Sequence, residues 1–216
     1  MAASEPLRDK VYIHARFVRL FHWLNAFGIT LMIMSGWRIY NASPLFDFRF
    51  PRDITLGGWL GGALQWHFAA MWLLVLNLLV YVIVGFVSGH FRRRFTPVSP
   101  SSVLTDMAKA VKGKLPHSAT TYNAVQKASY IGVLLVIVLT VLSGSVVWKP
   151  VQFQALGLLM GGYEGARLVH FFGMTAICAF IVLHLTLVLI VPSTLIPMVV
   201  GWTRKADHEP EASHEH

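Results

Sequence analysis

The chain has 216 residues, of which 55% are apolar and only 13% are charged, and its formal net charge is +8. Soluble domains carry about 25% charged residues, so this composition excludes an ordinary soluble globule and a disordered chain. The single cysteine, Cys178, excludes a disulfide scaffold and every site that needs several thiols, such as a cysteine-ligated iron–sulfur cluster, a CxxC zinc site or CxxCH haem attachment.

Four apolar runs follow one another along the chain, at about residues 20–37, 68–87, 130–148 and 168–191. Each has 18 to 24 residues, enough for a helix to cross a hydrocarbon core of about 30 Å. Strands of a β-barrel would be about half as long and would alternate in polarity. The sequence therefore predicts an all-α membrane protein, a four-transmembrane-helix bundle with helices at about 17–40, 64–88, 124–148 and 166–191.

The segments outside these runs divide the chain further. We expect a polar N-terminal arm over 1–16, the helical domain over 17–192, and an interfacial segment with a disordered acidic tail over 193–216. The loop 41–65 is glycine-rich and predicts a structured external loop. The basic stretch 91–121 predicts a surface helix at about 103–114.

The positive charges favour one orientation in the membrane. If the N-terminus is cytoplasmic, 13 of the 18 Lys and Arg residues lie on the cytoplasmic side, in the arm, the second loop and the tail. The positive-inside rule therefore predicts a multi-pass membrane protein with both termini in the cytoplasm.

Four of the ten histidines fall within the predicted spans, where an ionisable side chain is costly and therefore indicates a function. His170 and His184 lie 14 residues apart, close to four helical turns, so they share one helix face about 21 Å apart. By depth, His184 pairs with His22 on the inside, and His170 pairs with His67 on the outside.

Each pair can supply two axial imidazoles to one haem. A bare zinc or copper site needs three or four converging ligands, whereas here the ligands come in twos at two depths. Gly36 and Gly85 lie on the histidine faces of the first and second helices and leave room for a flat macrocycle. Two imidazoles fill both axial positions of the iron, so such a haem transfers electrons rather than activating a substrate.

Several segments resemble the cytochrome b subunit family of formate dehydrogenases (the gamma subunit), thiosulfate reductases and nickel–iron hydrogenases. They are Arg19-Leu-Phe-His22-Trp23, Ser35-Gly36, Tyr122-Asn123-Ala-Val-Gln126-Lys127, the Ser143-Gly144 to Lys149-Pro150 segment, and the spacing of His170 and His184. The resemblance implies a four-helix conduit of the bacterial inner membrane, with two haems b between a periplasmic oxidoreductase and ubiquinone or menaquinone. It also implies haem ligation by the four histidines in the couples given above.

In the family, a quinone pocket lies near the inner haem, and this likeness makes Asn123, Gln126 and Lys127 candidate quinone contacts. Equally well, Asn123 could cap the third helix and Lys127 could be a positive residue that anchors it on the cytoplasmic side. Four arginines at haem depth are candidate partners of the haem propionates: Arg16, Arg19, Arg38 and Arg167. Substrate chemistry would reside on a partner chain with an iron–sulfur or molybdenum centre, which leaves this chain without catalytic residues of its own.

Other functions stay open. The chain could be a stand-alone quinone oxidoreductase, for example one that reacts with superoxide, or a small transporter or channel that uses histidines as proton relays. Its partners are expected to be the bilayer, quinone and a periplasmic redox protein, with a homo-oligomer possible and nucleic acid excluded.

Overall fold

The computed structural model describes residues 10–88 and 124–204. Its four long helices are α1 (Arg16–Tyr40), α2 (Leu60–Val87), α5 (Ala124–Trp148) and α7 (Gly162–Ile190). Each contains a stretch long and apolar enough to cross a membrane. The predicted all-helical class and the four spans are therefore confirmed.

Two of these helices begin four residues earlier than the sequence predicts, α2 at Leu60 and α7 at Gly162. Glycines are frequent in both first turns and have low helix propensity, which favours a loop when the sequence is considered alone. In the structure, Ala63 and Ala166 in these turns are fully buried. Packing against neighbouring segments therefore outweighs the low propensity.

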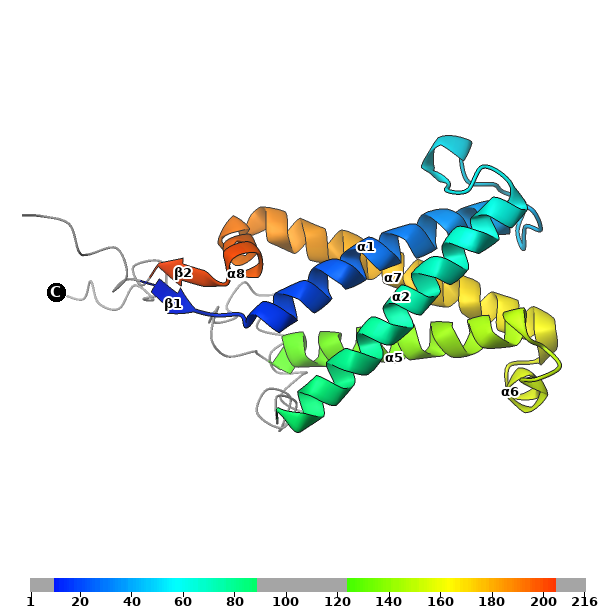
Figure 1. The fold of residues 1–216 in the computed structure, drawn as a ribbon. Helices are drawn as coiled ribbons and strands as arrows, with labels where there is room; N and C mark the ends of the chain where they lie inside the picture. Colours follow the sequence, from blue (N-terminus) through cyan, green and yellow to red (C-terminus); the bar gives the residue numbers. More distant parts are fainter. Residues whose placement is uncertain (1–9, 89–123, 205–216) are drawn as a thin grey trace, which may run out of the picture.

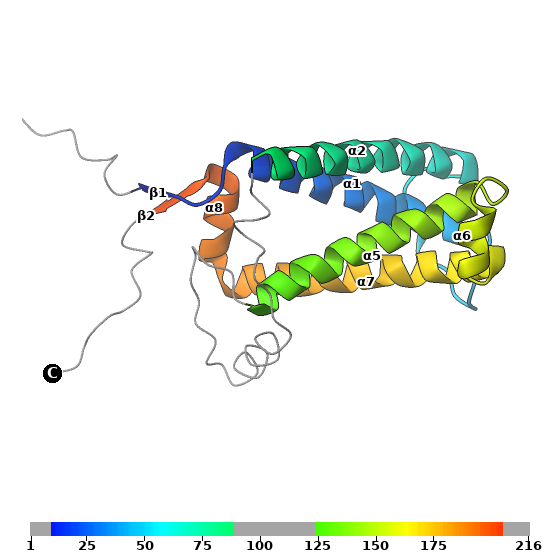
Figure 2. The same ribbon diagram turned by 90° about the horizontal axis from the view of Figure 1, so that it is seen from below.

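The helices form two layers, α1 with α2 and α5 with α7 (Figure 2). Small residues bring the helices of each layer close together. A Cβ on Gly28 of α1 would lie 2.7 Å from Leu74 Cδ2 of α2, and a Cβ on Gly173 of α7 would overlap Thr140 of α5. Small residues at helix contacts are typical of membrane proteins, whose helices associate through close backbone approach.

Large apolar side chains face outward along the helices, as at Leu135 (64% exposed) and Val182 (65% exposed). In a soluble protein such surfaces would be a strong aggregation hazard, whereas in a bilayer they contact lipid tails. The outward apolar surface therefore fits an integral membrane protein.

The two ends of the described chain meet at one end of the bundle, which we call the termini end (Figure 1). Strand β1 (Lys10–Tyr12) pairs antiparallel with β2 (Trp202–Arg204). After α7, Pro192 begins the short turn η2 (Pro192–Thr194), which leads into α8 (Leu195–Val200). Arg19 Nη1 donates to the Val199 carbonyl at 2.6 Å and Trp23 Nε1 donates to that of Met198 at 3.2 Å. These two bonds satisfy carbonyls of α8 that have no partner within the helix.

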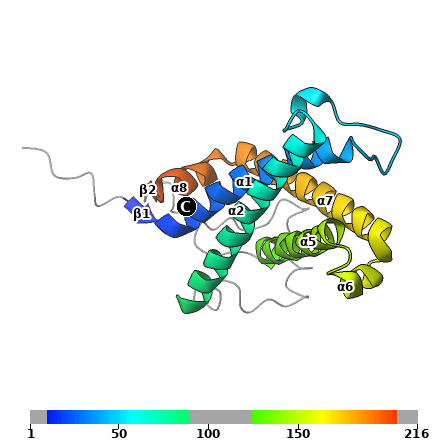
Figure 3. The same ribbon diagram turned by 45° about the vertical axis from the view of Figure 1, so that its right-hand side comes forward.

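The two connections within the layers lie at the opposite end, which we call the loop end (Figures 1 and 3). Residues 41–59, with the turn η1 (Arg52–Ile54), join α1 to α2, and α6 (Gln154–Leu159) lies between α5 and α7. Aromatic rings hold the longer connection against the helices: Phe50 stacks on Trp37 at 4.8 Å and Phe46 contacts Phe171 at 5.2 Å between centroids. The connection is thus folded onto both layers.

Candidate haem sites

Four histidines face one another in two pairs, one pair toward each end of the bundle. At the termini end, His22 of α1 faces His184 of α7, with ring centroids 6.2 Å apart. At the loop end, His67 of α2 faces His170 of α7, with ring centroids 6.4 Å apart. These are the same couples that the sequence predicts, and α7 contributes one ring to each.

Both separations match the span of an iron held between two imidazoles. A metal–imidazole nitrogen bond is about 2.0 Å long and the nitrogen lies about 1.1 Å from the ring centroid, so opposed ligands have centroids about 6.2 Å apart. Within residues 10–88 and 124–204, no three His, Cys, Asp or Glu side chains converge as ligands of a bare ion. The donor sets therefore fit a haem, whose porphyrin supplies the remaining ligands.

The ring of His67 is fixed from behind by α1. Its Nδ1 lies 3.0 Å from Oγ of Ser35, a residue with no exposed surface. The Ser35 hydroxyl donates its hydrogen to the Leu31 carbonyl at 2.6 Å, so its oxygen is left to accept a hydrogen from His67 Nδ1. Nε2 of His67 then keeps its lone pair, which is the form that binds a metal.

His170 is fixed in the same way by α5. Its Nδ1 lies 2.9 Å from the Thr140 carbonyl and 3.4 Å from Oγ of the buried Ser143. A carbonyl oxygen only accepts hydrogen bonds, so Nδ1 of His170 carries the hydrogen and Nε2 is free for the metal. A partner of this kind behind a ligating histidine also orients its ring.

A glycine follows each of these serines and lies against the same histidine ring. A Cβ on Gly36 would be 3.5 Å from His67 Cε1, an ordinary contact, whereas a Cβ on Gly144 would be only 2.9 Å from His170 Cε1. Gly36 is predicted from the sequence to leave room for a macrocycle, whereas in the structure its open side faces the His67 ring. Gly85, the second expected glycine, is buried in α2.

The pair at the termini end has a different environment. His22 Nδ1 is buried and has no hydrogen-bond partner among the described residues. Its ring contacts Trp23 edge to face at 5.1 Å, and the ring of His184 stacks on Phe180 at 6.0 Å. Among the described residues, aromatic rings rather than hydrogen-bond partners therefore adjoin these two imidazoles.

The four candidate propionate partners are divided between the two ends of the bundle. At the termini end, Arg16 and Arg19 line one pocket of about 570 Å³, and Arg19 also donates to α8. Arg167 donates to Ser43 and to Glu164 (2.9 Å), and so holds the start of α7 against the loop 41–59. Arg38 lines a cavity within that loop together with two further arginines. The structure does not bring the four together.

The candidate quinone contacts fall at the edge of what the structure describes. Asn123 lies outside the described residues, and Gln126 and Lys127 belong to the first turn of α5, where only the backbone is described. Their role stays a prediction.

Two features of the sites were missed at the sequence level. Ser35 and Ser143 form part of the motifs noted above, but their contact with the histidine rings depends on which helices are neighbours. In the sequence, only the repeated Ser-Gly pair indicates that these two serines have a shared role.

The second feature is Asn77, which is 6% exposed. It donates to Asn25 Oδ1 at 2.8 Å and to the Phe21 carbonyl at 3.2 Å, and so links α2 to α1 next to His22. Such polar contacts between membrane helices are stabilising.

The chain is similar to several known proteins. The family of prokaryotic cytochrome b561 matches residues 13–201. A relative from Azospira oryzae, which carries the name of a protein-methionine-sulfoxide reductase subunit, YedZ1, is 51% identical over 190 residues, covering 88% of this chain and 96% of its own length.

More distant relatives belong to other complexes. A nickel–iron hydrogenase B-type cytochrome subunit of Bradyrhizobium diazoefficiens is 22% identical, covering 82% of this chain and 77% of its own length. The formate dehydrogenase cytochrome b556(fdo) subunit of Escherichia coli is 23% identical, covering 92% and 88%. These names cover several oxidoreductases, and each of the three proteins is a subunit.

Proposed function

Since the chain belongs to the prokaryotic cytochrome b561 family, we propose that it holds two haems b, one between each histidine pair. Membership makes it an integral membrane cytochrome b, an electron-transfer subunit linked to an oxidoreductase partner. The proposed role is to carry electrons between that partner, at the loop end, and quinone, at the termini end. With both termini in the cytoplasm of a bacterium, the loop end faces the periplasm.

The observation that carries this proposal is the nearly equal spacing of the two pairs, 6.2 and 6.4 Å between ring centroids. A haem held between each pair would supply a one-electron iron couple. His67 and His170 orient their rings through hydrogen bonds to the neighbouring helices, and His22 and His184 present the second pair about 21 Å along α7.

The partner is proposed to be an enzyme of the methionine-sulfoxide-reductase kind. The relative of that name is 51% identical to this chain, against 22% and 23% for the hydrogenase and formate dehydrogenase subunits. This chain would then supply electrons to the partner and contain no residue that contacts the sulfoxide.

The proposal is tested by haem content. The full chain, purified in detergent from cells supplied with haem precursor, is expected to show a b-type spectrum on reduction and two haems per chain by pyridine haemochrome assay. His67→Ala and His22→Ala are each expected to retain one haem, with different remaining spectra. A control, His14→Ala, alters a histidine outside the pairs and is expected to keep both.

Full two-haem absorbance in His67→Ala contradicts the assignment, and a wild-type chain without haem contradicts the proposal as a whole and favours a proton relay. Reconstitution in liposomes separates the stand-alone alternative from a subunit: a subunit oxidises quinol only when its partner or an artificial acceptor is present. Oxidation of quinol by superoxide or oxygen without a partner supports the alternative.

A further inference from the structure

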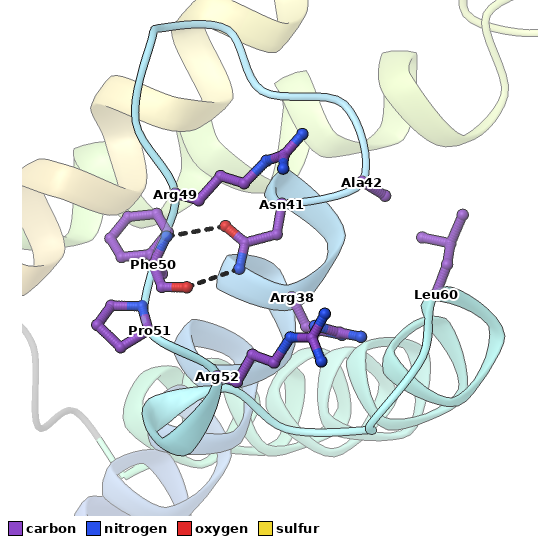
Figure 4. A pocket seen from close by; sticks show the side chains of 8 residues that line it. All are labelled: Arg38, Asn41, Ala42, Arg49, Phe50, Pro51, Arg52 and Leu60. Atoms are coloured by element: carbon purple, nitrogen blue, oxygen red, sulfur yellow. Dashed lines mark hydrogen bonds between the residues drawn. The ribbon is translucent and has the colours of Figure 1, made fainter.

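Three arginines surround one cavity at the loop end. Arg38 lies in the last turn of α1, and Arg49 and Arg52 lie on either side of Phe50 and Pro51 in the loop. The cavity has a volume of about 430 Å³ (Figure 4). Figure 4 shows the three arginine side chains extending away from the Phe50 and Pro51 rings. Three positive charges therefore share one hollow in the protein surface.

No carboxylate of the described residues lies within 4.0 Å of any of these guanidinium groups; the ion pair described at this end joins Arg167 to Glu164 instead. Asp47 and Asp53 of the same loop form no ion pair with these arginines, so the three positive charges repel one another at short range. An anion placed among them reduces that repulsion. The planar guanidinium group binds carboxylate or phosphate through two parallel hydrogen bonds. The cavity thus has the character of an anion site.

The loop that carries two of these arginines is held rigidly. The Asn41 side chain donates to the Phe50 carbonyl at 2.8 Å and accepts from the Phe50 amide at 2.9 Å, as the dashed lines in Figure 4 show. Phe50 also stacks on Trp37, and Leu56 N donates to the Met34 carbonyl at 3.0 Å. A binding site that is already in place loses less conformational entropy when a partner binds.

We propose that the redox partner docks on this cavity and inserts surface carboxylates between Arg38, Arg49 and Arg52. This inference rests on the proposed function and adds the place and chemistry of docking. Beside the arginines, the same loop exposes Phe46 (40%) and Phe48 (45%), and arginine with aromatic residues is the composition enriched in protein interfaces.

The position also suits electron transfer. The rings of Phe46 and Phe48 contact Phe171, at 5.2 and 6.3 Å between centroids, and Phe171 directly follows His170 in α7. A partner bound to this loop is therefore separated by few side chains from the histidine pair at the loop end.

The test measures binding of a fluorescent hexaglutamate peptide to the full chain in phosphatidylcholine nanodiscs, with hexaglutamine as the uncharged probe. We expect hexaglutamate to bind and hexaglutamine not to bind. The affinity for hexaglutamate should fall as the salt concentration rises. Arg49→Gln and Arg52→Gln are each expected to weaken binding about threefold, and the double variant about tenfold. The control, Lys149→Gln, removes one exposed positive charge at the same end outside the cavity and is expected to change binding less than twofold.

Equal weakening by Lys149→Gln, or no hexaglutamate binding to the unaltered chain, overturns the inference. The same measurement is repeated in nanodiscs that contain phosphatidylglycerol. If that lipid abolishes the part of peptide binding that depends on Arg49 and Arg52, the cavity holds a lipid headgroup and the inference is wrong. Haem content is measured on the same samples. Absence of haem contradicts the proposed function, whereas intact haem with no effect of Arg49→Gln contradicts this inference alone.

Discussion

The two histidine pairs have nearly the same spacing but differ in what lies behind each ring. At the loop end, His67 and His170 each give their Nδ1 hydrogen to a neighbouring helix, at 3.0 and 2.9 Å. At the termini end, His22 Nδ1 has no partner in the described part of the chain, and aromatic side chains adjoin the rings. Hydrogen bonds to neighbouring helices therefore fix the orientation of both rings at the loop end. At the termini end, no hydrogen bond from the described residues fixes the ring of His22.

The largest expected effect comes from the glycine against His170. Gly144→Ala places a Cβ 2.9 Å from His170 Cε1, so the ring must move and the loop-end haem should bind about 10–100 times more weakly. We expect haem content to fall toward one per chain. Gly36→Ala is the matched control, because its Cβ meets His67 Cε1 at 3.5 Å and should leave two haems. If the two variants lose haem equally, the different Cβ distances at Gly144 and Gly36 do not determine haem binding.

Ser35→Ala should change the redox potential of one haem. Removing the hydroxyl that accepts from His67 Nδ1 makes the imidazole a weaker donor to iron, which favours the reduced state. We expect the loop-end midpoint to rise by about 59 mV, a tenfold change in the one-electron equilibrium, while the other midpoint stays constant. Ser145→Ala, whose hydroxyl bonds only the Val141 carbonyl among described residues, is the control in a potentiometric titration. Unchanged midpoints in Ser35→Ala contradict a role of this hydroxyl.

Ser143→Ala should act in the same direction but more weakly. The Thr140 carbonyl, 2.9 Å from His170 Nδ1, remains after the hydroxyl at 3.4 Å is removed. We expect a midpoint change less than half that of Ser35→Ala in the same titration. A larger change would mean that Ser143, not the carbonyl, is the main partner.

The smallest effect is expected at the termini end. Trp23→Phe keeps an aromatic ring beside His22 but removes the indole hydrogen bond to the Met198 carbonyl. A single exposed hydrogen bond contributes about 1 kcal/mol, so the apparent Tm should fall by a few degrees with both haems retained. Trp66→Phe, an exposed tryptophan at the start of α2, should leave Tm unchanged. Loss of a haem in Trp23→Phe would show that His22 depends on this bond.

The histidine couples could be predicted from the sequence because helical spacing fixes depth. His170 and His184 lie on one face of one helix whatever their neighbours are. His67 falls at the depth of His170, and His22 falls at the depth of His184. Ser35 could not be assigned in this way, since its contact with His67 requires knowing that α1 packs against α2. The position of Arg38 likewise depends on the fold of the loop. Arg38 is two residues after Gly36, about 200° around the helix, so it lies away from His67 and lines the loop cavity.

Because α7 supplies one ring to each pair, neither site exists until the last span has been made. A chain that has inserted α1, α2 and α5 contains His22 and His67 but no partner for either. The pairing of β1 with β2 likewise joins residues 10–12 to residues 202–204, from opposite ends of the chain. If the pairs hold haems as proposed, biogenesis has a fixed order. Cofactor loading then follows membrane insertion of α7, and a chain truncated before α7 presents only half of each site.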